Sequence, residues 1–167
     1  MKRNVISPAE ITQIGLLTAL LTVAGAIKLP SLLPGLEFQI SAPLAVGICF
    51  VFGFKRYLII GILSSMISLA LGTHNLFNVA IAMQFRIVVG IIYLLAGQAR
   101  NKYLVMAIAG PLGTLVARLT LSVVLGKGAG ALVVAAFPGM VFTFLTAPFM
   151  VGLLRRVARV GHLAHQG

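Results

Sequence analysis

Two arginines fall inside apolar stretches of this 167-residue chain, and they are the residues best suited to bind a charged ligand. Arg86 lies ten residues into a run that begins near Leu76, and Arg118 lies within a second run, about 103–125. A guanidinium in apolar surroundings is costly and needs an acceptor. For Arg86 the acceptor is Glu37, a main-chain carbonyl freed by a proline, or an anionic group on a ligand. Arg118 could instead extend its long side chain to a polar boundary.

Six further polar side chains lie at the ends of apolar stretches or inside them, where they could orient a ligand: Glu37, Gln39, His74, Asn75, Asn78 and Gln84. Each type also has a structural use. An acid favours the first turn of a helix, a histidine suits a polar turn, and a buried amide can hydrogen-bond a neighbouring helix. At the helical rise of about 1.5 Å per residue, these groups and the two arginines fall in one half of the apolar layer or at its middle. We therefore predict a pocket open at one end.

Catalysis and metal binding are not predicted. The only two acidic residues, Glu10 and Glu37, belong to opposite ends of the predicted helices and cannot form a catalytic pair. His74 lies at one end, whereas His162 and His165 lie near the C-terminus, and no carboxylate joins either group at metal-ligand spacing. The phosphate-binding pattern GxxxxGK[ST] is absent from the sequence, so ATP hydrolysis would have to come from partners. We expect no enzyme activity and no cofactor.

The composition is that of a protein immersed in lipid. Hydrophobic residues make up 60% of the chain and charged residues 9%, whereas soluble domains carry about 25% charged residues. The net charge of +11 is scattered between apolar segments and forms no continuous stripe, so nucleic acid is not a predicted partner. The sequence predicts an all-α integral membrane protein.

Turn residues and basic pairs divide the chain into six apolar stretches, each of roughly the length that a membrane-spanning helix needs, about 17–25 residues. They cover approximately residues 9–27, 36–54, 57–71, 76–99, 103–125 and 129–154. The pair Lys55-Arg56 separates the second stretch from the third. We predict a six-transmembrane-helix bundle in which residues 1–160 form a single membrane domain and residues 161–167 a flexible C-terminal tail.

Basic residues alternate between the connecting segments in a way that fixes the orientation. With the N-terminus in the cytoplasm, nine lysines and arginines fall inside and two outside, which fits the positive-inside rule. The inside set is Lys2, Arg3, Lys55, Arg56, Arg100, Lys102, Arg155, Arg156 and Arg159, and the outside set is Lys28 and Lys127. Both termini are therefore predicted to be cytoplasmic (N-in/C-in), and the predicted pocket then opens to the outside.

The first apolar stretch carries small residues at a spacing of four. Gly15 and Ala19 form one pair, and Thr22 and Ala26 form another. This spacing lets a second helix approach closely within lipid. The second helix belongs either to the same bundle or to a partner subunit, and the pattern alone leaves both possibilities open.

The stretches "ITQIGLLTALLTVAGAIKLP" and "LEFQISAPLAVGICFVFGFKRYLIIGILSSMISLALG" resemble the first three helices of the substrate-binding S components of energy-coupling-factor (ECF) vitamin transporters. Gly15 and Ala19 stand where that family has an AxxxA-type motif that contacts a transmembrane coupling subunit. The resemblance implies capture of a vitamin or vitamin precursor from outside, partnership with the coupling subunit and two ATPase subunits, and a place in the plasma membrane of a prokaryote.

The function that we expect is thus the S component of an ECF-type ABC importer that binds a small anionic vitamin or precursor. The alternative is a self-sufficient homo-oligomeric small-solute transporter or channel. A proton-coupled carrier of that kind is expected to hold a carboxylate at the middle of the membrane, and no acid lies at such a position in this chain.

Overall fold

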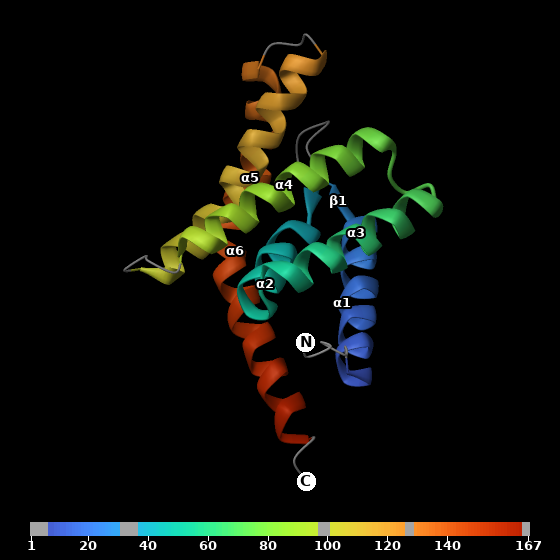
Figure 1. The fold of residues 1–167 in the computed structure, drawn as a ribbon. Coiled ribbons are helices and arrows are strands. Elements are labelled where there is room, and N and C mark those ends of the chain that lie inside the picture. Colours follow the sequence, from blue (N-terminus) through green and yellow to red (C-terminus); the bar gives the residue numbers. More distant parts are fainter. Residues whose placement is uncertain (1–6, 31–36, 97–100, 126–128, 165–167) are drawn as a thin grey trace, which may run out of the picture.

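The computed structural model describes residues 7–30, 37–96, 101–125 and 129–164 (Figure 1). In this part of the chain it has six helices and one small antiparallel hairpin, in which Lys28 pairs with Gln39 and Pro30 with Glu37. The elements are α1 (Pro8–Ala26), β1 (Lys28–Pro30), β2 (Glu37–Gln39), α2 (Ser41–Phe52), α3 (Phe54–Ala70), α4 (Leu76–Leu95), α5 (Lys102–Leu125) and α6 (Ala129–Ala164).

Four of these helices are long and apolar enough to cross a membrane: α1, α4, α5 and the 132–159 part of α6. Helix α2 has 12 residues and α3 has 17. At about 1.5 Å per residue, the 12 residues of α2 rise about 18 Å, which is less than the ~30 Å of hydrocarbon. The several apolar helices indicate a multi-pass membrane protein.

Helix α2 forms the centre of the structure, and the other helices pack around it (Figure 1). Every residue from Pro43 to Cys49 is buried, as expected of a helix that is apolar on all sides. On the outer helices, by contrast, many large apolar side chains are exposed, such as Leu16, Leu95 and Val123. The core therefore contains α2, and the outer helices turn their apolar faces to the lipid.

The second predicted helix is wrong at both ends. Its predicted first turn contains strand β2, and the helix begins only at Ser41. Lys55 and Arg56, which were expected to separate the second and third helices, instead lie in the first turn of α3. The break falls at Gly53, whose φ of 84° and ψ of 162° belong to a region that essentially only glycine adopts. A single residue thus reverses the chain where we expected a polar loop.

Replacing Gly53 with alanine is expected to destabilise the protein by about 1–3 kcal/mol, because the new side chain strains this backbone conformation. Thermal unfolding of the purified protein in detergent, followed by the circular dichroism of its helices, measures the change. Gly152→Ala in α6 is the control, since a Cβ there meets no atom within 4 Å. Equal melting temperatures for both variants would show that the α2–α3 connection tolerates other backbone angles.

The C-terminal region also differs from its prediction. Beyond residue 154, where the sixth predicted stretch ends, the chain continues α6 as far as Ala164, which includes residues 161–164 of the predicted tail. Arginine, alanine and leucine are good helix formers, and the single Gly161 costs only about 1 kcal/mol in a helix. Residues 165–167 lie outside the described residues.

An ion pair joins the start of α1 to the start of α3. Arg56 Nε, in the first turn of α3, donates to Glu10 Oε1, in the first turn of α1, at 2.8 Å. The start of α1 also lies at the same end of the molecule as the end of α6 (Figure 1). This end, defined by Glu10 and Arg56, is called the ion-pair end below.

Candidate functional site

A cavity of about 430 Å³ lies at the end of the bundle opposite the ion-pair end. Its walls come from the C-terminal halves of α1, α3 and α5 and from the beginnings of α2, α4 and α6. All six helices therefore line the cavity with the part that lies away from the ion-pair end. A polar pocket confined to one end is what the depth of the polar residues predicted.

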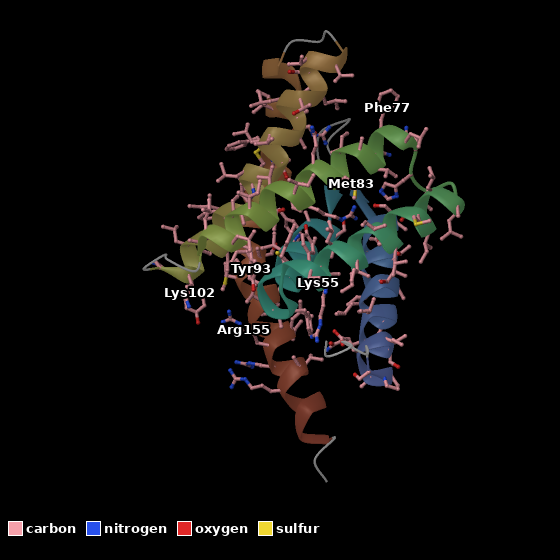
Figure 2. The ribbon with its side chains drawn as sticks, viewed as in Figure 1. Lys55, Phe77, Met83, Tyr93, Lys102 and Arg155 are labelled. Atoms are coloured by element: carbon pink, nitrogen blue, oxygen red, sulfur yellow. The ribbon has the colours of Figure 1, made fainter. Side chains whose placement is uncertain are left out.

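Arg86 is the charged residue most deeply placed in the cavity wall. It is 7% exposed, and its Nη1 donates to Ser65 Oγ at 2.7 Å and to Met83 Sδ at 3.3 Å. Both acceptors are neutral, and both bonds use one of the guanidinium nitrogens, which together offer five N–H donors. Figure 2 shows Met83 on α4.

No described carboxylate neutralises Arg86. Of the two acids in the chain, Glu10 pairs with Arg56 at the ion-pair end, and the side chain of Glu37 is not among those described. Within the described lining the cavity carries Arg86 and Arg118 and no acid. A buried cation without a compensating charge is costly unless an anion joins it, so the cavity is electrostatically suited to an anionic solute.

The position of Arg86 depends on a glycine in the facing helix. A Cβ on Gly61 of α3 would overlap the Nε and Cδ atoms of Arg86, so only the bare backbone leaves room for this side chain. Ser65, one turn further along α3, then accepts the hydrogen bond. Helix α3 therefore packs against Arg86 at Gly61 and accepts a hydrogen bond from its guanidinium at Ser65.

Hydroxyl groups form a second feature that the sequence analysis missed. Ser64, Ser65 and Ser68 of α3 line the cavity, and further hydroxyls come from α2, α5 and α6. These are Ser41, Thr114 and Thr143. The signal was present in the spacing Ser64-Ser65-x-x-Ser68, which places three hydroxyls on adjoining positions of one helical turn inside an apolar stretch. Such groups can donate to a carboxylate or accept from a neutral ligand.

Arg118 is the second cation of the cavity wall. It is half-buried on α5 and has no hydrogen bond or ion pair with another described residue. Helices α4 and α5 touch at Gly113, where a Cβ would lie 2.8 Å from the Phe85 ring and 3.3 Å from the Phe85 carbonyl oxygen. Arg118 lies five residues beyond this crossing, about 7.5 Å along α5, whereas Arg86 follows Phe85 directly.

The turn between α3 and α4, together with the first turn of α4, supplies three more of the predicted residues. His74 and Asn78 line the cavity, and a Cβ on Gly25 of α1 would lie 3.7 Å from the His74 ring. Asn75 is the N-cap of α4, where its side-chain oxygen accepts from the Asn78 backbone N–H at 2.9 Å. Asn75 thus has a structural role that starts the helix carrying Arg86.

The structure therefore brings together four of the eight predicted ligand residues: His74, Asn78, Arg86 and Arg118. Asn75 and Gln84 are not part of the described lining. Glu37 and Gln39 lie in strand β2, and their side chains are outside the described part of the structure.

The small residues of α1 divide between two faces. Gly15, Ala19 and Ala26 are exposed, and a Cβ on Gly15 would meet nothing within 4 Å. Thr22 is buried against α3, with its hydroxyl 3.0 Å from Ser64 Oγ and 2.8 Å from the carbonyl oxygen of Thr18. Three of the four predicted docking residues are thus available at the surface, and Thr22 serves internal packing.

Together, the fold and the cavity define a helical multi-pass membrane protein with a polar, cationic cavity of the size of a small solute. The sequence is 48% identical over 137 residues to Protein BioX of Lysinibacillus sphaericus, a match that covers 82% of this chain and 81% of that protein. The chain therefore belongs to the family of Protein BioX. No protein-family model and no solved structure matches it.

Proposed function

We propose that this protein is the membrane-embedded substrate-binding component of an ECF-type importer, and that it captures a small anionic vitamin or vitamin precursor from outside the cell. Kinship with Protein BioX, which comes from a bacterium, supports a place in a prokaryotic plasma membrane. The sequence resemblance to S components supports the assignment to this transporter class.

The observation that carries the proposal is the state of Arg86. Its guanidinium is almost fully buried, lines a solute-sized cavity and has only neutral partners among the described side chains. Structural arginines in membrane proteins are expected to have an acid or several carbonyls around them. An anionic ligand supplies the missing acceptor, with Ser65 beside it as a hydroxyl donor.

The proposal includes the six-span, N-in/C-in topology. Arg56 and Glu10 form a pair at one end of the bundle, and the cavity opens at the other. Figure 2 shows Lys55, Lys102 and Arg155 in the lower part of the molecule and Phe77 in the upper part. Basic residues face the cytoplasm, so this arrangement supports a cavity that faces outward. Lys2, Arg3, Arg100 and Lys127, which also entered the orientation argument, lie outside the described residues.

Delivery to the cytoplasm then needs partners. A cavity restricted to one end offers no continuous polar path across the bundle, and the chain has no phosphate-binding loop of its own. A transmembrane coupling subunit and two ATPase subunits would supply both the rearrangement and the energy. The alternative is a homo-oligomeric transporter, and the exposed small residues of α1 would suit a second copy of the chain as well.

Native mass spectrometry of the gently purified protein tests the proposal. We expect a co-purified small anion or, after washing, saturable binding of one member of a panel of carboxylate-bearing vitamins and precursors. Co-expression with an ECF coupling module should yield a complex with the module's subunits. A homo-oligomer that takes up solute in proteoliposomes without partners would favour the alternative, and a protein that binds no anion would contradict the proposal.

A further inference from the structure

The two arginines of the cavity are held apart along its wall. Arg86 lies at the crossing of α4 and α5, and Arg118 lies about 7.5 Å beyond it along α5, by the helical rise. They belong to different helices and share no described partner. One carboxylate held by Arg86 and Ser65 would therefore leave the charge of Arg118 unbalanced.

The wall between the two arginines is mostly apolar. On α4 the lining residues at the five positions before Arg86 are Ile81, Ala82 and Phe85. On α5, Thr114 and Ala117 line the cavity between the crossing and Arg118. A solute that contacts this wall thus meets a cation, then a mostly apolar surface with one hydroxyl group, then a second cation.

The geometry points to a solute with two anionic groups joined by a short apolar chain, with one carboxylate bound by Arg86 and Ser65 and the other by Arg118. This inference rests on the proposed anion-binding function and specifies its substrate class. Two carboxylates balance both guanidinium charges, and methylene groups between them match the apolar wall.

The experiment compares three ligand series with the full-length protein in nanodiscs: α,ω-dicarboxylates of increasing length, their monoamides, and monocarboxylates of the same length. A monoamide keeps the shape of the diacid and removes one charge. We expect the wild-type protein to bind the best diacid roughly 10-fold or more tightly than its monoamide, because a hydrogen bond to a charged group is lost. Isothermal titration calorimetry gives the dissociation constants.

Two variants test the assignment of the carboxylates. Arg118→Gln should bind diacid and monoamide with equal affinity, at the level that the wild type shows for the monoamide. Lys102→Gln is the matched control, because it removes one exposed cation from the other end of the same helix, outside the cavity, and it should retain the full preference for the diacid. Melting temperatures verify that both variants are folded.

The results separate this inference from the proposed function. Equal affinity of the wild type for diacid and monoamide, or an unchanged diacid preference in Arg118→Gln, would overturn the two-anion solute and leave anion capture standing. If no member of the three series, and no anionic vitamin in the wider panel, bound to the folded wild type, the proposed function would fall as well.

Discussion

Replacing Arg86 with alanine is expected to weaken solute binding by about 100-fold, while the helical fold persists. Truncating one member of a buried, hydrogen-bonded charge pair costs about 2–5 kcal/mol, and each 1.4 kcal/mol is a factor of ten in affinity. In the free protein the same change removes a buried cation with neutral partners, so we expect little loss of thermal stability. Calorimetric titration and a melting curve on the same preparation measure both quantities.

A second variant reaches the same site without removing any charge. Gly61→Ala places a methyl group where the Arg86 side chain now lies, so the guanidinium must move away from Ser65. Binding should fall by at least about 10-fold, the loss expected for one charged hydrogen bond. Gly152→Ala, whose Cβ meets no neighbouring atom, should bind as the wild type does. Unchanged solute affinity in both Arg86→Ala and Gly61→Ala would show that this cavity is not where the solute binds.

Long-range charge and hydropathy patterns made the general arrangement predictable. Apolar length located the helices, and the depth of Arg86, Arg118 and Asn78 located a polar pocket at one end, because helical rise converts sequence position directly into depth. These inferences use only distances along a single helix. Such inferences do not require knowledge of which helices are neighbours.

The features that were missed depend on contacts between helices or on backbone angles. Gly53 reverses the chain through a positive φ, and no hydropathy pattern distinguishes it from a glycine inside a helix. The packing of Gly61 against Arg86 joins residues 25 positions apart. The serines of α3 were overlooked because hydroxyls are common in membrane helices, where they often bond to their own backbone, as Thr143 does with the Gly139 carbonyl at 2.9 Å.

The small residues on the exposed face of α1 are the basis for the second prediction with a large expected effect. Gly15 and Ala19 lie on the exposed face, whereas Thr22, on the same helix, is buried against α3. The alternative of internal packing, which the sequence left open, therefore applies to Thr22, and the exposed pair stays available to a partner helix. Nearby exposed Leu16 and Val23 would add apolar contact area on that face.

The double substitution Gly15→Leu with Ala19→Leu is expected to abolish co-purification with the coupling subunit and to stop uptake in cells. Two large side chains prevent the close helix approach that small residues permit. The isolated variant should still bind solute with wild-type affinity, because a Cβ at Gly15 meets no atom within 4 Å and Ala19 is exposed. Gly152→Leu, a substitution at another exposed position, on α6, is the control and should retain both properties. Loss of solute binding together with docking would instead mean that the exposed face of α1 supports the fold itself, and normal uptake would place the docking surface on another helix.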